Sequence, residues 1–551
     1  MKLSVLAASL CLAFAGAVTA DDEKTTDLNL SVIGQYQTGV FDDGAAEIVA
    51  HDKSTQRLFA INASANTVDV LDINDPTNPV LMGTIDATDL GGGANSVAVH
   101  EGVVAVAIEA EDKQAPGVVA FYDAVDLGLI NSVTVGALPD MVTFTPNGKY
   151  LLVANEGEPN DDYSVDPEGS VSIIDLEHGV SHAKVRTADF TRFNKYEDKL
   201  KKRGIRIFGP GASVAQDLEP EYITVSKNSK HAWVSLQEAN ALALIDIRRA
   251  KVKRLLPLGT KDHTLPENAL DVSNRDDMIN IANWPIKGMY QPDAITSYNF
   301  RGRTFIVTAN EGDSRDYDGF SEEERVKDLV LDPVAFPDAA TLQADENLGR
   351  LKTTTVNGDI DGDGDFDEIY SYGARSFSIR NARGKLIYDS ADDFERITAE
   401  LLPNDFNSNN DENDSFDSRS DDKGPEPEGV TVGKIEDSTF AFIGLERVGG
   451  IMVYDITNPH RVRFVQYLNN RDFTVDAELP DGSTNPLVGD LGPEGITFIA
   501  EDDSPVESPL LVVGNEVSGT TTIYSIDVIE DEDDEEEDDS EDEKQNISTE
   551  P

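Results

Sequence analysis

Acidic side chains recur along this 551-residue chain at two fixed points of a short repeated phrase. The first point is a Pro-acid-hydrophobic step just before an apolar stretch, and it holds Asp140, Glu221, Asp293, Glu428 and Glu494. The second point follows the next apolar stretch, and it holds Glu156, Glu238, Glu311, Glu446 and Glu516. Weaker copies upstream carry Glu47, Asn62, Asn95 and Glu109 at the same points. Oxygen ligands of this kind are those that hard cations such as Ca²⁺ prefer. The spacing therefore predicts a cation site, provided that the fold brings these residues together.

A β-propeller is the fold that would do so. About seven copies of a phrase roughly 40–50 residues long, built from short strands, are typical of an all-β, seven-bladed propeller of the YVTN or WD40 kind. Equivalent positions of all blades meet around one axis, so we expect two rings of acids near the mouth of the channel. The predicted metal ligands there are Glu156, Glu238, Glu311, Glu428, Glu446, Glu494 and Glu516. The alternative is that these acids cap turns or pair with local arginines, but converging like charges repel unless cations neutralise them.

The strands that would position these acids can be placed along the chain. Residues 79–87, 129–137, 252–259 and 462–469 each have the pattern of the last strand of a blade. The final copy ends at 520–528 without such a strand, whereas residues 30–39 have the same pattern before the first copy. We therefore predict that the N-terminal strand completes the last blade and closes the ring, which removes exposed sheet edges.

Four insertions, at 177–218, 260–291, 317–357 and 391–427, interrupt the repeat and are expected to form a lid over one channel mouth. The first contains a predicted short helix with Gly204 just past its end. The third contains a predicted helix over 321–331, with Ser321 as N-cap and Glu324 completing a capping box. The second half of the fifth blade is predicted at 373–381 and 385–390, beyond the third insertion.

The sharpest local motif is GDIDGDGDFDEIY at 358–370. Its alternating acids follow a D-x-D-x-D-G spacing with Gly364 at the turn, and they are Asp359, Asp361, Asp363, Asp365 and Asp367. A tight loop of this kind folds several carboxylates onto one Ca²⁺. Tyr370 stands where an EF-hand would carry its bidentate Glu, which favours a strand-flanked calcium loop over an EF-hand. The alternative is a solvated acidic loop.

Basic residues lie near several of these acidic phrases. Arg315 follows Glu311 in ANEGDSRDY, and Arg375, Arg419 and Lys423 occupy comparable polar loops. Arg and Lys beside metal-bound carboxylates can clamp a phosphate, so these four residues are the candidate substrate-binding groups. The alternative, that they pair with the surrounding acids, is at least as well supported in so acidic a chain. There is no G-x-S-x-G motif and no histidine spacing typical of a zinc or haem site.

The composition excludes several classes of protein. A formal net charge of −59 argues against nucleic-acid binding and against binding to anionic membranes. Residues 1–20 are predicted to be a signal peptide cleaved after Ala20, and the only cysteine, Cys11, lies within it. We expect a polar lead at 21–29, one propeller domain at 30–528, and a disordered acidic tail at 529–551. The sequence predicts a secreted protein, periplasmic or extracellular, with no membrane span.

Four segments resemble the choice-of-anchor I family of secreted or surface β-propeller proteins. They are VTANEGDSRDYDGF, YSYGARSFSI, DSRSDDKGPEPEGV and LGPEGITF, and the resemblance covers about residues 30–528. Some members are labelled alkaline phosphatase, although the family offers no settled catalytic residues to transfer. A more distant likeness to β-propeller phytases and phytase-like esterases rests only on the Pro-Glu-Gly steps and the ring of acids, and it implies a calcium-lined channel mouth.

Two functional hypotheses follow. The first is a calcium-dependent phosphoesterase of the alkaline phosphatase or phytase type, acting on a phosphorylated small molecule at the carboxylate-lined mouth. Another divalent cation could replace calcium in that role. The second is a non-catalytic binding or adhesion propeller, in which calcium rigidifies a surface for an extracellular matrix or cell-surface partner.

Overall fold

The computed structural model describes residues 26–529 of the chain. The predicted signal peptide and almost all of the predicted acidic tail lie outside these residues. Asn29–Asp527 form one compact unit, and apart from the outermost residues of its first and last strands the propeller lies within it. No helix within the described range is long and apolar enough to span a membrane.

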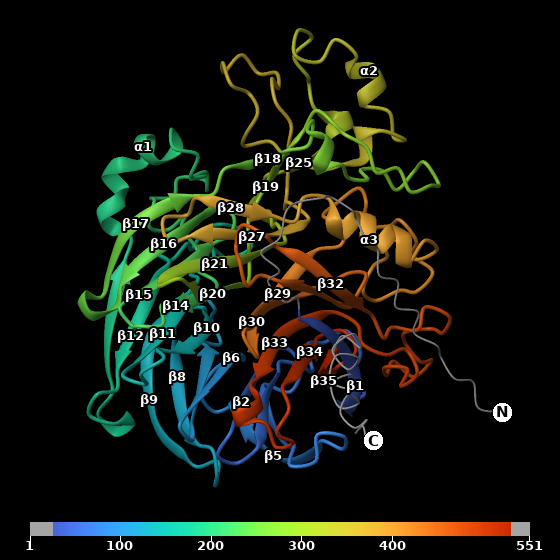
Figure 1. Cartoon of the computed structure of the whole chain (residues 1–551). Helices are drawn as coiled ribbons and strands as arrows, with labels where there is room; N and C mark the ends of the chain where they lie inside the picture. Colours follow the sequence, from blue (N-terminus) through green and yellow to red (C-terminus); the bar gives the residue numbers. More distant parts are fainter. Residues whose placement is uncertain (1–25, 530–551) are drawn as a thin grey trace, which may run out of the picture. The chain divides into compact units, whose positions relative to one another are not determined.

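Seven four-stranded antiparallel sheets make up the described structure, together with three smaller sheets (Figure 1). Blades 1 to 3 consist of β2 (Val49–Asp52), β3 (Arg57–Asn62), β4 (Thr67–Asp72) and β5 (Val80–Asp86); β6 (Gly93–His100), β7 (Val103–Glu109), β8 (Pro116–Asp123) and β9 (Leu129–Ala137); β10 (Pro139–Phe144), β11 (Tyr150–Asn155), β12 (Ser170–Asp175) and β13 (Lys184–Asp189). Blades 4 and 5 consist of β14 (Ile223–Val225), β15 (His231–Leu236), β16 (Ala241–Asp246) and β17 (Lys251–Pro257); β20 (Ile295–Phe300), β21 (Arg303–Asn310), β27 (Ser376–Asn381) and β28 (Leu386–Asp389). Blades 6 and 7 consist of β29 (Pro427–Ile435), β30 (Ser438–Leu445), β31 (Ile451–Asp455) and β32 (Arg463–Leu468); β33 (Pro493–Ile499), β34 (Leu510–Asn515), β35 (Thr520–Ile529) and β1 (Asp27–Gln37).

The blades form a closed ring. Their first strands contact one another in the cyclic order β2, β6, β10, β14, β20, β29, β33 and back to β2 (Figure 1). In the seventh blade the N-terminal strand β1 lies beside the C-terminal strand β35, as the sequence predicted. The predicted seven-bladed propeller closed by its N-terminal strand is therefore confirmed.

The apolar core lies between neighbouring blades. One cluster joins Phe59 and Val70 of blade 1 to Val106 and Ala120 of blade 2, and equivalent clusters fill the other gaps. The second strand of a blade is covered on both faces, and β34 is buried along its whole length. The outer strand β5, by contrast, is mostly exposed. Stacked sheets thus explain why the inner strands read as continuous apolar runs rather than as alternating patterns.

The insertions carry the remaining elements. The small sheets are β18 (Thr260–Asp262), β19 (Lys287–Met289) and β26 (Tyr370–Ser371); β22 (Asp316–Tyr317) and β23 (Phe320–Ser321); β24 (Glu323–Arg325) and β25 (Lys352–Thr354). The α-helices are α1 (Glu197–Lys201), α2 (Ala339–Leu342) and α3 (Asp393–Leu401). The 3₁₀ turns are η1 (Val180–His182), η2 (Thr191–Tyr196), η3 (Ile247–Arg249), η4 (Pro266–Asn268), η5 (Val326–Asp328), η6 (Leu348–Arg350) and η7 (Glu501–Asp503). Helix α1 confirms the first predicted helix, with Gly204 in the left-handed region at φ 85° beyond its end.

The predicted helix over 321–331 is wrong. Residues Glu323–Arg325 form strand β24, which pairs with Lys352–Thr354, and Val326–Asp328 form only one 3₁₀ turn. The buried carboxylate of Glu322 pairs with the guanidinium of Arg206, 116 residues earlier in the chain. A capping box adds little to stability compared with such a buried, charge-assisted contact, so the tertiary environment overrides the local helix signal.

One buried carboxylate, Asp490, links the two strands that close the ring. Its oxygens accept hydrogen bonds from Gln35 on β1 and Asn470 at 2.7 and 2.8 Å. Thr520, Thr522 and Tyr524 on β35 donate to it at 2.7 to 2.9 Å. We predict that Asp490→Asn lowers the free energy of unfolding by about 2–3 kcal/mol, because either orientation of the amide turns an NH₂ group toward donors. Thermal denaturation should show this loss. The control is Asp527→Asn, at an exposed position on β35, which should change stability little. If both variants lose equal stability, the role assigned to Asp490 is contradicted.

Candidate metal centre

Three acids of the first ring are aimed by β-bulges. In blade 6, Pro427 pairs with Leu445 and Val430 with Ile443, so one extra residue lies in β29 around Glu428. The same irregularity lies around Asp140 on β10 and around Glu494 on β33. A bulge turns a side chain out of the regular alternation of a strand, and bulges are frequent at functional sites. The Pro-acid step is therefore the local signal that directs these carboxylates.

The glycine after the acid has a separate role. A Cβ atom on Gly429 would lie 2.0 Å from the carbonyl oxygen of Glu494 in the next blade. A Cβ atom on Gly495 would lie 2.6 Å from the carbonyl oxygen of Glu47 in the blade after that. Only glycine allows the first strands to approach so closely, which explains the Pro-Glu-Gly steps in blades 6 and 7.

The second ring lies at the same edge of the blades. Its acids follow the second strands, and because those strands run antiparallel to the first, their ends meet the beginnings of the first strands. One repeated backbone hydrogen bond fixes this geometry. The amides of Glu156, Glu446 and Glu516 donate to the carbonyls of Leu138, Glu426 and Gly492 at 2.8, 2.9 and 2.8 Å. Each acceptor lies two residues before an acid of the first ring.

The two rings converge on one cavity of about 380 Å³. Ten carboxylates, two cationic groups and one amide line it: Asp140, Glu156, Glu221, Glu238, Asp293, Glu311, Asp313, Glu428, Glu446, Glu516, Lys423, Arg447 and Gln237. Six of the seven ring residues predicted as ligands are in this lining. Glu494 is not in the lining, although its charge helps to raise the pKa of Glu428, after burial and the charges of Glu446 and Glu311.

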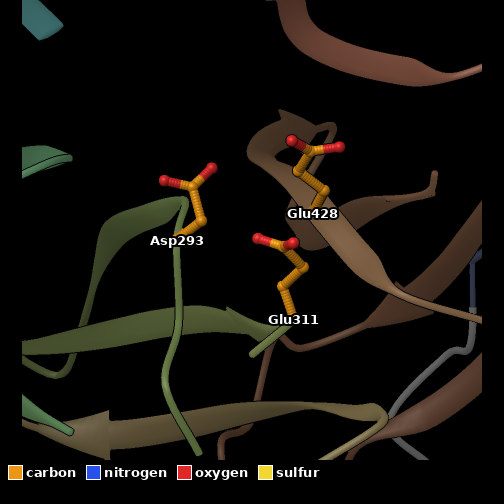
Figure 2. A group of neighbouring side chains, drawn as sticks. All are labelled: Asp293, Glu311 and Glu428. Atoms are coloured by element: carbon orange, nitrogen blue, oxygen red, sulfur yellow. The ribbon is translucent and has the colours of Figure 1, made fainter. Parts of the chain in front are cut away.

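Within the cavity, Asp293, Glu311 and Glu428 offer carboxylate oxygens that all lie within 4.8 Å of one another. Figure 2 shows their side chains pointing toward a common space from blades 5 and 6. Glu311 accepts hydrogen bonds from Lys423 and Gln237, at 2.8 and 2.9 Å. In contrast, Oε2 of Glu428 is buried without a hydrogen-bond partner, and so is Oε2 of Glu221, a lining residue whose exposed fraction is 6%. Unpaired buried carboxylate oxygens are what a cation site requires.

A neighbouring triad, Glu311, Glu426 and Glu446, is already neutralised by the chain itself. The Lys423 ammonium lies 2.8 Å from Glu311 and 2.7 Å from Glu426. Arg447 lies 3.1 Å from Glu426 and 2.9 Å from Glu446. Although burial opposes its ionisation, Lys423, Arg419 and Arg447 together hold the pKa of Glu426 well below its usual value. The space between Asp293, Glu311 and Glu428 is therefore the part of the ring best suited to a metal ion.

The remaining carboxyls hold protons more strongly than exposed acids. Burial, followed by the charge of Glu311, raises the pKa of Asp293 well above its usual value, and burial followed by Glu446 does the same for Glu428. Burial is also the main cause for Glu238 and Asp313, where it raises the pKa to about 8, and for Asp140, where it raises the pKa to about 7. A divalent cation would have to displace these protons, so binding and proton release are coupled.

These shifts predict how the stability of the metal-free protein depends on pH. Unfolded Asp and Glu titrate near pH 4, so between about pH 4 and 8 the folded protein binds more protons than the unfolded chain. The free energy of unfolding is therefore highest at the acidic end of this window and decreases as the pH approaches 8. With a chelator present, we expect the Tm to fall by roughly 5 °C or more from pH 5.5 to pH 8. Added CaCl₂ should remove most of that decrease; a Tm that rises with pH in the chelator would contradict this assignment.

All four predicted phosphate-binding residues have internal partners, and those of Lys423 are Glu311 and Glu426. Arg315 is buried and pairs with Asp217 and Glu219, and Arg375 is buried and pairs with Glu395. Arg419 lies 2.8 Å from Glu426 and 3.1 Å from Asp422. Among the four, only Lys423 lines the described cavity.

The predicted calcium loop lies apart from the described cavity lining and is mostly exposed. Oxygens of Asp359, Asp361 and Asp367 lie within 4.8 Å of one another, and Asp365 and Asp367 form a second such group with Asp332. Asp359 accepts hydrogen bonds from the amides of Gly362 and Gly364, at 2.7 and 3.1 Å. Four of the five predicted acids are thus brought together, and Asp363 instead accepts from the amide of Asp365.

Four residues of the site were not predicted. Gln237 and Arg447 are chain neighbours of Glu238 and Glu446, so the repeat itself could have identified them. Asp313 follows Glu311 by two residues. In blade 3, Glu158 follows Glu156 at the same spacing. Glu426 precedes the Pro-Glu step of blade 6, as Glu219 precedes that of blade 4. Only the structure reveals that Glu426 holds Lys423 and Arg447 in place.

Comparisons of sequence identify relatives. The family model described as the choice-of-anchor I domain matches residues 47–459. Gigasin-3a from Magallana gigas is 32% identical over 191 residues, which are 34% of this chain and 67% of that protein. A mesenchyme-specific cell surface glycoprotein from Strongylocentrotus purpuratus is 25% identical over 348 residues, which are 56% of this chain and 44% of that protein. The chain therefore spans about two thirds of the first relative and less than half of the second.

Solved propeller structures are similar over most of their length. The WD40 domain of Toxoplasma gondii coronin has a TM-score of 0.44 and 9% identity, covering 92% of this chain and 88% of that one. The β-propeller domain of Cps50 (Swd1) from Myceliophteria thermophila has a TM-score of 0.42 and 8% identity, covering 90% and 99%. The assignment of the fold rests on the seven sheets and their cyclic contacts.

Proposed function

The chain belongs to the choice-of-anchor I family, and we propose that it is a calcium-binding β-propeller acting outside the cytoplasm. The single observation that carries the proposal is the convergence of two carboxylate rings on one cavity, in which Asp293, Glu311 and Glu428 face a common space. The name of the sea-urchin relative, a cell surface glycoprotein, supports the location.

The donor set favours calcium over other metals. The cavity offers carboxylates and one carboxamide, and no histidine or cysteine is among its described lining residues. Zinc and copper prefer nitrogen or sulfur ligands, whereas Ca²⁺ accepts six to eight oxygens in flexible geometry. The residues present therefore fit a calcium ion held chiefly by Asp293, Glu311 and Glu428, with Glu221 and Asp140 beside them.

We assign the loop at 358–370 a second, exposed calcium site with a weaker hold. Asp359, Asp361 and Asp367 would bind the ion, and Asp332 and Asp365 lie on the other side of Asp367. An exposed loop pays more to order its ligands than a rigid ring does, so its affinity should be lower. This ion would stabilise the third insertion and would not contribute to the central cavity.

A metal-dependent phosphoesterase is the second candidate, and the position of Lys423 favours it. This residue brings a cationic group into the carboxylate cavity, where it could neutralise a phosphate oxygen next to a bound metal. The non-catalytic binding propeller requires only that the metal hold the mouth rigid. Because Arg315 and Arg375 are paired internally and are not available for a phosphate, they give more support to the non-catalytic binding propeller.

One experiment tests the proposal and separates the two roles. Full-length protein, stripped with a chelator and dialysed, is titrated calorimetrically with CaCl₂ at pH 8. The proposal predicts saturable binding with release of protons; no binding heat and no thermal stabilisation would overturn it. The loaded protein is then given phosphomonoesters, phosphodiesters and phytate, with Glu311→Ala as the comparison. Turnover that Glu311→Ala abolishes supports the phosphoesterase, whereas equal turnover, or none, supports the binding propeller.

A further inference from the structure

Buried polar atoms without a hydrogen-bond partner gather at a second place, the loop 406–424. Asn407 Oδ1, Ser408 Oγ, Asp417 Oδ2 and Ser418 Oγ are all of this kind. Asn407 has an exposed fraction of 0% and Asp417 one of 3%. Buried polar groups in native proteins nearly always have a partner, so this concentration points to a ligand of the loop.

The hydrogen bonds of the loop fix which atoms are available. Ser420 donates its hydroxyl proton to Oδ1 of Asp417, so its oxygen accepts from Nδ2 of Asn407 at 2.9 Å. The same Nδ2 also donates to Glu395, at 3.4 Å. The amide of Asn407 therefore has one orientation, with Oδ1 left as an acceptor. Oδ1 of Asn407 is thus an unpaired acceptor, and Oδ2 of Asp417 is an unpaired carboxyl oxygen from which a cation would displace any proton.

The charges around this loop are unbalanced. Arg375 pairs with Glu395 at 2.5 Å and donates to the carbonyls of Asp271 and Ser420, at 2.6 and 2.8 Å. Asp276, whose charge acts on Asp417, has another buried oxygen without a partner, Oδ2, while its Oδ1 accepts from the amide of Met278. Burial is the main cause that raises the pKa of Asp417 to about 8. The hydrogen bond from Ser420 lowers this pKa, whereas the charges of Asp271, Asp276 and Glu395 raise it further. A water molecule would satisfy these oxygens but not their charge, whereas a cation would satisfy both.

From this geometry we infer that a hard cation of the calcium type binds in the loop, between the side-chain oxygens of Asp276, Asn407 and Asp417. The donors are all oxygens, and they come from two insertions that are far apart in the sequence, 260–291 and 391–427. The same loop continues through Arg419 and Lys423 to Glu426, which interact with the central ring. The ion is therefore structural: it fixes the segment that delivers Lys423 and Glu426 to the cavity.

The test counts calcium ions bound by the full-length protein. Chelator-stripped wild type and the variants Asp417→Asn, Asp276→Asn and Asp481→Asn are loaded with CaCl₂ alone, passed through a desalting column and analysed by inductively coupled plasma mass spectrometry. Asp481 is the matched control, because it is an exposed loop acid whose Oδ1 already accepts two hydrogen bonds from Ser483. We expect Asp417→Asn and Asp276→Asn each to bind one ion fewer than wild type, and Asp481→Asn to bind the same number.

The outcome is distinguishable from failure of the central site. Adding Asp417→Asn to a variant that lacks Asp293 and Glu428 should remove one further ion, since the two sites share no ligand. Wild-type stoichiometry in both Asp417→Asn and Asp276→Asn would overturn the inference, whatever the ring variant does. Should Asp417→Asn fail to fold, the partly exposed Asp276→Asn decides the question by the same count.

Discussion

Replacing Asp293 by Asn and Glu428 by Gln together is expected to weaken calcium binding at the ring by more than about 100-fold, because even residues behind the ligands of a metal site contribute 10–100-fold. Both replacements keep the shape of the side chain and remove its charge. Glu311 keeps its hydrogen bonds from Lys423 and Gln237, so the cavity wall is preserved. Calorimetric titration with CaCl₂ at pH 8 measures the loss.

The same double variant should be more stable than wild type when no metal is present. Two carboxyls whose ionisation is opposed by burial and by neighbouring acids have become neutral, so less repulsion remains at pH 8. Weaker binding combined with higher metal-free stability distinguishes a ligand from a residue that merely supports the fold. The exposed pair Asp472→Asn and Glu501→Gln is the matched control and should leave both quantities unchanged. An unaltered affinity in the ring variant would contradict the assignment of the ligands.

Replacing Lys423 by Met should, in contrast, lower the stability of the metal-free protein. Its ammonium lies between Glu311 and Glu426, and removing one partner of such a buried ion pair costs about 3–5 kcal/mol, since the other charge stays unpaired. Met keeps most of the side-chain volume, so the loss reports on charge rather than on packing. Urea denaturation in the presence of a chelator measures it.

Calcium should restore much of the stability of Lys423→Met. Without the ammonium, the triad of Glu311, Glu426 and Glu446 keeps only Arg419 and Arg447 as counter-ions, and a divalent cation can neutralise the charge that is left. Lys434→Met is the control, because the Lys434 side chain is exposed and lies 3.8 Å from the fully exposed Asp437, a pair of negligible strength. If Lys423→Met and Lys434→Met lose equal stability, Lys423 does not act as an internal counter-ion.

The sequence predicted the propeller and its rings well because both depend on repetition. The phrase around Glu428 matches that around Glu494, and a closed ring places equivalent positions together without any knowledge of distant contacts. The bulges that aim these side chains also follow from local sequence, through the Pro-acid-Gly step. Signals that occur once per blade were therefore sufficient to predict the architecture and most of the cavity lining.

Features that depend on unique long-range partners could not be predicted in this way. Arg315 was a candidate for phosphate binding, but it pairs with Asp217, 98 residues away, a contact that no local pattern encodes. Glu322 likewise belongs to a buried pair with Arg206 instead of to a helix. The role of Lys423 as a counter-ion follows only from the structure, since the sequence cannot show that Glu311 and Glu426 lie on either side of it.

Anomalous diffraction from crystals of the full chain grown with Ca²⁺ would locate the metal ion directly. We expect an anomalous difference peak at about 2.3–2.6 Å from oxygens of Asp293, Glu311 and Glu428, with Lys423 still between Glu311 and Glu426. A map without a peak at the ring, from crystals whose Ca²⁺ concentration saturates the protein in solution, would contradict it.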